Sequence, residues 1–278
     1  MEILIHMGLP KTSSSTLQFA VWKSLESQGI LHLNTWRKTD PTEALDKRPS
    51  SRLFNREPIN SEYLQFHQSK LNILSDESFT APFRLRKNNY GNNIETAFSF
   101  PRKIRKQIDD LYQDKTIKVL VVLRNHCDLL FSQYVEEHNL KKFKNINFIF
   151  EEDNKTINLD GFEIYNYSRY LDEVYSVFGQ ENVSVLFYEQ LKYDRRNFFE
   201  VLANLSNTDI NFVSSAFECH DLNAKTKTEK GYYTKDRSTL IPYLTQLQKD
   251  HIKSHFKSDT RKLIERFRYK FDLKAYGY

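Results

Sequence analysis

The sequence predicts a single α/β domain over residues 1–278, with a central, mostly parallel β-sheet flanked by helices. Short apolar runs rich in branched side chains alternate along the chain with longer amphipathic stretches. Runs that are apolar almost throughout are typical of strands covered on both faces, as in a parallel sheet between helices. A chain of 278 residues can bury a substantial core. Two small domains would also fit this length, but one large domain is the simpler interpretation.

The predicted elements alternate along the chain. Gly8 and Pro10 end the first strand, and apolar residues then recur at helical spacing up to Gly29. Residues 35–70 and 141–160 are polar and irregular, and we expect them to be insertions near the binding site. The predicted strands cover residues 3–5, 30–33, 71–74, 118–123 and 183–187, the clearest helices cover residues 128–139, 167–178 and 195–205, and helical structure is expected from residue 238 onward.

The composition is that of a folded protein without a membrane span. Hydrophobic residues make up 39% of the chain and charged residues 28%. No apolar run approaches the roughly 20 residues needed to cross a bilayer. The N-terminus shows no signal-peptide pattern, so we expect a cytoplasmic protein. Cys127 and Cys219 are far apart and form no CxxC pair, which predicts two buried thiols rather than a disulfide or a zinc site.

The net charge of +5 favours an anionic ligand without identifying it. Basic clusters occur within residues 84–87, 102–106 and 141–144. Such runs are typical of solvated helix faces, and without a recognised motif they do not predict nucleic-acid binding. His251 and His255 are one helical turn apart, but no third ligand accompanies them. We therefore expect a surface pair and no metal.

A lysine and five consecutive hydroxyls separate the first predicted strand from the helix that follows it. A helix start leaves four backbone N–H groups without internal partners and carries a partial positive charge, so it is suited to hold an anion. The simpler interpretation, that Ser14 or Ser15 only caps the helix, explains one hydroxyl and leaves the others unexplained. The segment predicts a phosphate-type site made of Lys11, Thr12, Ser13, Ser14, Ser15 and Thr16.

Residues 121–134 repeat this arrangement. Arg124 follows an apolar strand, Asp128 is a reasonable cap for the next helix, and Ser132 lies one turn further on the same face. A kinase-type site would have an acidic residue for magnesium after such a strand, so a cation here indicates a second anion. A planar guanidinium suits phosphate oxygens, although an arginine paired with a local carboxylate is the alternative. The glycine patterns GxxxxGK[ST] and GxGxxG are both missing.

Together the two segments resemble those of sulfotransferases that use 3′-phosphoadenosine 5′-phosphosulfate (PAPS), in particular bacterial members of the carbohydrate type. "PKTSSSTLQ" resembles the loop for the 5′-phosphosulfate, "LRNHCDLLFSQY" resembles the motif for the 3′-phosphate, and residues 166–194 resemble the segment that follows in bacterial members. The resemblance implies a P-loop-NTPase-like sulfotransferase fold. Three residues depart from the family pattern. Ser13 replaces the usual glycine, His126 replaces a proline that is often found, and Leu17 replaces the tryptophan that stacks on adenine in many members. The residue that would contact adenine therefore stays unassigned.

The resemblance also assigns roles. Residues 11–16 would hold the phosphosulfate, with Lys11 at the leaving group, and Arg124 and Ser132 would hold the 3′-phosphate. "KTKTEKGYY" resembles the loop that closes over the cofactor. Lys230 and Gly231 are its matching pair, and Lys225 and Lys227 are alternatives to Lys230.

The expected reaction is transfer of a sulfuryl group from PAPS to a hydroxyl or amine, without a metal. Asp76 and Glu77 follow an apolar strand, where a carboxylate can serve as the base. We favour Glu77, because members acting on sugars have a glutamate before a serine here, as Glu77 precedes Ser78. The acceptor is then a carbohydrate or glycolipid. Three alternatives stay open. In the first, Asp76 and Glu77 are solvated turn carboxylates. In the other two, the protein is a non-catalytic nucleotide-binding relative or an atypical P-loop nucleotide kinase. The sequence does not predict an oligomeric state.

Overall fold

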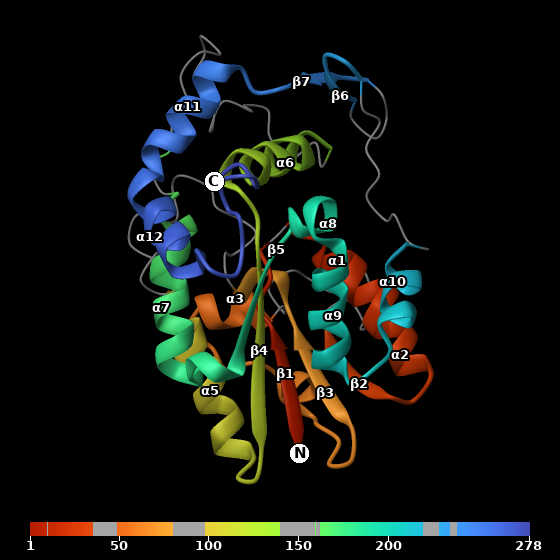
Figure 1. The fold of residues 1–278 in the computed structure, drawn as a ribbon. Coiled ribbons are helices and arrows are strands. Elements are labelled where there is room, and N and C mark those ends of the chain that lie inside the picture. The colour runs from red at the N-terminus through yellow and green to blue at the C-terminus, as the bar shows by residue number, and fades with distance from the viewer. Residues whose placement is uncertain are drawn as a thin grey trace.

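A five-stranded, fully parallel sheet forms the centre of the computed structural model, which describes residues 1–9, 11–35, 49–79, 98–139, 159, 162–218, 228–233 and 238–278. The strand order is β2-β3-β1-β4-β5 (Figure 1). All five predicted strands are confirmed. They are β1 (Glu2–His6), β2 (Leu31–Thr35), β3 (Leu71–Ser75), β4 (Thr116–Leu123) and β5 (Val183–Phe187).

Helices cover both faces of the sheet, as the apolar strands predict. Alternate strand residues point to opposite faces, so Ile3 and Ile5 join one core cluster and Leu4 joins the other. One face carries α5 (Phe100–Leu111), α7 (Tyr167–Phe178) and α12 (Lys257–Phe267), and the other carries α1 (Ser14–Thr16), α2 (Lys23–Ser27), α9 (Arg195–Ser206) and α10 (Ile210–Glu218) (Figure 1). The chain is therefore a single α/β domain of three layers.

The central strand β1 sets where the following loop leaves the sheet. His6 lies opposite Leu120 of β4. Beyond the strand, the backbone N–H groups of Met7 and Leu9 donate to the carbonyls of Leu120 and Val122, at 2.8 and 3.3 Å. The chain thus stays beside β4 up to Leu9, and the lysine-hydroxyl segment begins at the carboxyl edge of the sheet.

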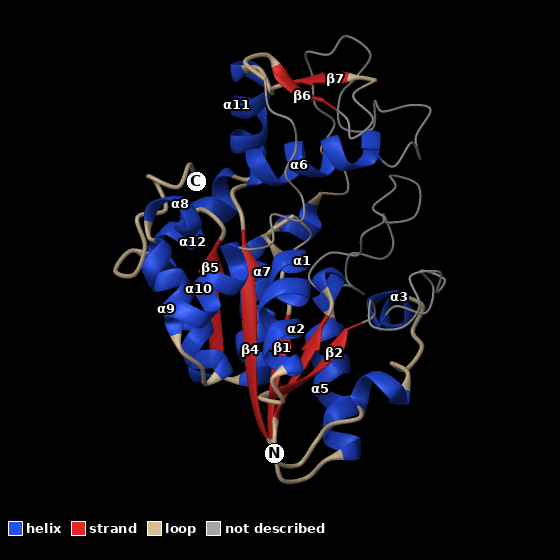
Figure 2. Ribbon diagram, turned by 90° about the vertical axis from the view of Figure 1, so that its right-hand side faces the viewer, coloured by secondary structure: helices blue, strands red, loops and turns tan. Residues whose placement is uncertain are grey.

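Helix α6 (His126–Asn139) lies across that edge, and a hairpin of β6 (Gly231–Tyr233) and β7 (Leu240–Pro242) lies beyond it (Figure 2). The expectation that Asp128 caps this helix is wrong. The Asn125 side chain accepts from the Asp128 N–H at 3.0 Å, so Asn125 is the capping residue and the helix starts two residues earlier. The strand β7 also corrects the prediction of uniform helix from residue 238; the helices α11 (Gln246–His255) and α12 follow it.

The polar segment over residues 35–70 contains short regular structure among the residues described. It includes α3 (Pro49–Phe54) and a 3-10 turn at Ser61–Leu64. Further single turns occur at Glu77–Phe79, Glu163–Tyr165 and Gln180–Asn182, with a short helix α8 at Gln190–Tyr193. Residues 36–48 and, apart from Leu159, residues 141–160 lie outside the described part of the chain.

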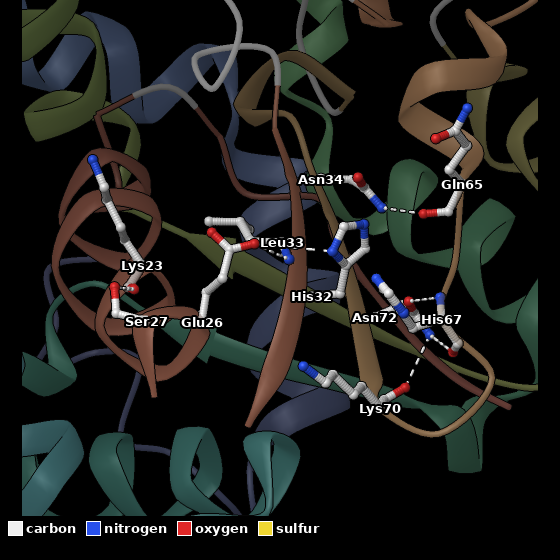
Figure 3. Close-up of polar contacts among 10 residues, drawn as sticks. All are labelled: Lys23, Glu26, Ser27, His32, Leu33, Asn34, Gln65, His67, Lys70 and Asn72. Carbon is white, nitrogen blue, oxygen red and sulfur yellow. Dashed lines mark hydrogen bonds and ion pairs between the residues drawn. The ribbon is translucent and has the colours of Figure 1, made fainter. Parts of the chain in front are cut away.

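Side-chain hydrogen bonds support β2, the first strand in the sheet order, and its neighbour β3 (Figure 3). The Glu26 carboxylate accepts from the Leu33 backbone N–H of β2 at 3.0 Å. Asn34 donates to the Gln65 carbonyl at 3.2 Å, and the buried Asn72 amide donates to three backbone carbonyls. The Glu26 bond thus occupies a backbone N–H of the edge strand β2, where open groups can pair with another strand, whereas Asn72 ties the interior strand β3 to β1 and to the chain that precedes it.

The structure describes one of the three basic clusters and the histidine pair that the sequence predicts to lie on the surface. Residues 102–106 lie on α5, where Arg105 and Lys106 form ion pairs one turn away with Asp109 and Asp110, as on a solvated face. The other two basic clusters and Cys219 lie outside the described residues.

Cys127 is a buried free thiol, and burial raises its pKa to about 11. His251 and His255 are exposed on α11. Among the helices described, none is long and apolar enough to cross a membrane.

Candidate active site

Four neighbouring strands end at the same edge of the sheet. Because the order is β3-β1-β4-β5, the residues that follow these strands are brought side by side. The lysine-hydroxyl segment follows β1, Glu77 follows β3, Arg124 follows β4, and Glu189 follows β5. The residues selected from the sequence at three separate places therefore belong to one region.

The segment after β1 is a tight loop with an unusual backbone. Lys11 and Ser13 have φ angles of 70° and 67°, in the left-handed region that favours glycine. The hydroxyls of Thr12 and Ser14 are buried and donate to the Leu9 carbonyl, at 2.6 and 3.2 Å. These two hydroxyls thus hold the shape of the loop, while those of Ser13, Ser15 and Thr16 are half-buried.

Helix α1 begins at Ser14, and no side chain caps it. The simpler interpretation, in which Ser14 or Ser15 serves only as a helix cap, is therefore wrong. The chain continues directly into a π-helical segment, Leu17–Trp22, and then into α2. Wider turns of this kind occur often at functional sites.

A cluster of three buried polar side chains, His6, Ser75 and Gln18, lies next to the loop. The sequence analysis did not predict it. The Ser75 hydroxyl lies 2.9 Å from His6 Nδ1 and 2.7 Å from Gln18 Nε2. Burial lowers the pKa of His6 to about 3, so this imidazole is neutral at physiological pH. A Cβ on Gly8 would come within 2.5 Å of His6 Nε2, so only glycine fits there. The available signal was a polar residue that ends an apolar run, since His6 is the last residue of β1 and Ser75 the last of β3.

Arg124 joins the end of β4 to this loop. Its Nη1 donates to the Lys11 carbonyl at 2.8 Å, and its guanidinium lies over the Tyr188 ring, 4.3 Å from the centroid. Its own carbonyl accepts from the Tyr167 hydroxyl at 2.8 Å. Nε of Arg124 is buried without a partner among the described residues. The guanidinium is thus anchored by a carbonyl and a ring, with donor capacity left for an anion.

Helix α6 brings Ser132 and Glu136 to the same region. Ser132 is half-buried, and Glu136 lies one turn further along the helix. The Lys11 ammonium forms an ion pair with the Glu136 carboxylate at 3.2 Å. This contact places the face of α6 that carries Ser132 against the loop after β1, which sequence reasoning did not foresee.

The two candidate bases differ in their surroundings. Asp76 is fully buried, and its carboxylate accepts from the Ser50 backbone N–H at 3.0 Å, at the start of α3. Anions at a helix N-terminus are stabilising, so Asp76 has a structural role there. Glu77 is 4% exposed, at the start of the turn Glu77–Phe79. Both carboxylates are thus buried at the end of β3, and the preference for Glu77 as the base stays a prediction.

The described part of the predicted closing segment, residues 228–233, leads into and forms the first strand of the hairpin next to α6. The rings of Tyr232 and Tyr243 pack against Phe131, with centroids 5.6 and 5.8 Å away, beside Ser132 in the chain. Lys230 is exposed. A Cβ on Gly231 would come within 2.0 Å of the Ile241 carbonyl oxygen, so the hairpin itself requires this glycine. Lys225 and Lys227 lie outside the described residues, and the choice between the three lysines stays open.

A second buried polar cluster at the ends of β4 and β5 was also missed. The Glu189 Oε1 atom accepts from both the backbone N–H and the side-chain amide of Asn125, each at 2.9 Å. Burial raises the pKa of Glu189 to about 7. The Glu189 Oε2 atom and the Tyr278 hydroxyl are both buried without a partner among the described residues. Glu189 thus fixes the turn that carries Arg124.

His126, which stands where the resembled family often has proline, is part of this packing. Its ring is stacked between Tyr167 and Phe256, with centroids 4.3 and 3.9 Å away, and its Nε2 lies 2.9 Å from the Tyr165 carbonyl. Burial lowers the pKa of His126 to about 4. The side chain is therefore a neutral packing residue at physiological pH.

We expect Ser13→Gly to stabilise the protein. Serine at a φ of 67° is strained, and glycine relieves that strain at some cost in chain entropy. The expected gain in unfolding free energy is about 0.5–1 kcal/mol, measured by urea denaturation. Ser15→Gly is the matched control, because Ser15 is helical and glycine there should lower stability by about 0.5 kcal/mol. Equal effects at both positions would contradict the assigned backbone strain.

Glu189→Gln should remove a pH dependence of stability. The carboxyl pKa rises from 4.5 in the unfolded chain to about 7 in the folded protein, so folding favours the protonated form. Stability from this group is complete below pH 4.5 and is lost as pH rises to about 7. Relative to the variant, the wild type should lose on the order of 3 kcal/mol over this range, measured by denaturation at several pH values. Parallel curves for the two proteins would show that the carboxyl does not titrate there.

The described residues contain no group of three or more His, Cys, Asp or Glu side chains placed to hold a metal ion.

Comparisons with known proteins agree with this architecture. A comparison with curated proteins gives no match. The crystal structure of a sulfotransferase from Alicyclobacillus acidocaldarius is similar, with a TM-score of 0.56 and 14% sequence identity, covering 99% of this chain and 98% of that chain. At this identity the likeness concerns the fold, which is P-loop-like in both. A model described as the sulfotransferase domain matches residues 4–257. Since that match spans most of the chain, the protein belongs to the sulfotransferase domain family, whose members transfer sulfuryl groups.

Proposed function

We propose that this protein transfers a sulfuryl group from PAPS to a hydroxyl or amine of a carbohydrate or glycolipid. One observation carries the proposal. The two segments that the sequence predicts to bind anions, distant in the chain, meet through the 2.8 Å bond from Arg124 to the Lys11 carbonyl. PAPS carries two separated anionic groups, a 5′-phosphosulfate and a 3′-phosphate, and two linked anion sites suit such a molecule.

The residues present fit this donor. Arg124 retains a buried Nε without a partner among the described residues, and Lys11 brings a second, half-buried cation to the same edge. Residues 11–16 would hold the phosphosulfate, and Arg124 with Ser132 would hold the 3′-phosphate. Bound there, the donor would supply an activated sulfuryl group. The loop's backbone N–H groups and the Lys11 ammonium would stabilise charge that develops on the leaving oxygen.

The acceptor needs a group that takes its proton. We assign this role to Glu77, which follows β3 beside the loop, because the Asp76 carboxylate is already used at the start of α3. Lys230 would contribute a further cation from the hairpin next to α6, and Gly231 allows that hairpin to form. The choice of a carbohydrate as acceptor rests on the resemblance of the Glu77–Ser78 pair to members that act on sugars.

A nucleotide kinase is the alternative with a different cofactor. It would need ATP with magnesium and an acidic residue after the strand next to the phosphate loop. The strand β1 that leads into the loop has two neighbours: Arg124 follows β4, whereas Asp76 and Glu77 follow β3. A kinase would therefore have to use one of these two acids for magnesium and would lack the GxxxxGK[ST] loop, so the nucleotide titration decides between the two functions. A non-catalytic nucleotide-binding relative on the same fold would bind the nucleotide without turnover, so binding and turnover are tested separately.

The first experiment is calorimetric titration with 3′,5′-adenosine bisphosphate, run beside ADP and ATP with magnesium. We expect micromolar affinity for the bisphosphate and weaker binding of ADP, because only the former carries the 3′-phosphate. Arg124→Ala should abolish this preference, a loss of about 1.5–3 kcal/mol for a charged hydrogen bond. Better binding of ATP with magnesium, or no binding at all, would overturn the PAPS assignment.

The second experiment addresses the base. Glu77→Gln should keep the wild-type affinity for the bisphosphate and lose turnover by about 10²- to 10⁴-fold, because an amide cannot accept the proton. Asp76→Asn should mainly lower the unfolding temperature, since Asp76 holds the start of α3. Sulfation can be followed by release of the bisphosphate in the presence of a panel of sugars. Turnover like the wild type in the Glu77 variant would remove this residue from the role.

A further inference from the structure

The cation of the phosphate loop is already paired with an acid. Lys11 Nζ lies 3.2 Å from Glu136 Oε2, and the two side chains are 13% and 17% exposed. Glu136 lies on α6, one turn beyond Ser132 and on the same face of the helix. A carboxylate therefore stands inside a region whose other features favour anions.

This arrangement has a clear electrostatic consequence. A largely buried ammonium needs a partner, and at this low exposure solvent screens the pair less than it screens a surface ion pair. An anionic ligand that contacts Lys11 would stand within a few ångströms of Glu136, and like charges at that distance repel strongly at low dielectric. Ligand and Glu136 thus compete for the same ammonium.

We propose that Glu136 is the counter-ion of Lys11 in the empty site and that the phosphosulfate of the donor displaces it. Glu136 is then a positioning residue: it keeps Lys11 against α6 before binding and lowers the affinity for the donor. The identity of the displacing ligand rests on the proposed function. The ion pair between Lys11 and Glu136 is observed independently of that function.

The chain offers a matched control in Glu173 on α7. Its carboxylate pairs with Arg102 of α5 at 2.5 Å and is 19% exposed, close to the 17% of Glu136. Both glutamates lose one ion pair when changed to glutamine. Only Glu136 pairs with a residue of the phosphate loop, so effects on ligand binding should be confined to that position.

The test compares Glu136→Gln, Glu173→Gln and the wild type. Calorimetry gives the dissociation constants for 3′,5′-adenosine bisphosphate and for inorganic sulfate, and thermal denaturation gives the unfolding temperature with and without the bisphosphate. Glu136→Gln should bind both anions more tightly, the bisphosphate by about five- to tenfold, because a competing charge is gone. It should also lower the unfolding temperature of the empty protein but not of the loaded one. Glu173→Gln should change neither dissociation constant.

A double variant links the effect to the lysine. In a Lys11→Met background the gain from Glu136→Gln should be clearly smaller, because no ammonium remains to be released. Unchanged or weaker anion binding by Glu136→Gln, or an equal loss of unfolding temperature in empty and loaded protein, would overturn the displacement. If the wild type does not bind the bisphosphate, the proposed function fails. The sulfate titration then decides, since tighter sulfate binding supports the displacement and unchanged binding overturns it.

Discussion

The hydrogen bond from the Arg124 guanidinium to the Lys11 carbonyl is the contact on which the site depends. It joins residues 113 positions apart in the chain. The two can meet because β1 and β4 are neighbouring parallel strands and the loop follows β4 for three residues beyond His6. A bond from a charged donor also orients the Lys11 peptide at a φ of 70°, which a lysine rarely adopts. The topology of the sheet and the conformation of the loop are therefore coupled through one guanidinium.

The loop keeps its shape against a local cost. Two non-glycine residues at positive φ cost about 1–2 kcal/mol each. The buried hydroxyl bonds of Thr12 and Ser14 to one carbonyl return only about 0.5–1.5 kcal/mol each, so they do not exceed that cost. The remainder comes from surrounding structure, which includes the Arg124 contact and the cluster of His6, Ser75 and Gln18 beneath the loop. Strain of this kind persists only where the surroundings fix it, which is common at binding sites.

The sequence predicts what depends on local pattern and misses what depends on distant partners. The strands were predicted correctly because apolar runs buried on both faces leave a clear signal. Lys11 and Arg124 were selected as candidates because each follows such a run, and the structure shows that they are in contact. The run of hydroxyls gave no sign that Thr12 and Ser14 donate to the backbone of their own loop. Glu136 and Glu189 left no signal, because their partners are 125 and 64 residues away. Asn125 was overlooked as the cap because Asp128 fits the same local rule.

Carboxylates stand close to both cations of the candidate site, and we expect them to restrict which anions bind. A site whose only charges were Lys11 and Arg124 would attract polyanions with little discrimination, since that attraction depends on charge rather than on shape. Glu136 neutralises the lysine until a ligand offers a better-placed anion, and Glu189 is held beside the turn that carries Arg124. If the donor displaces Glu136 as proposed, a ligand gains most when one anionic group contacts Lys11 and a second contacts Arg124. On this reasoning, the separation of two anionic groups, more than their total charge, decides which nucleotide binds.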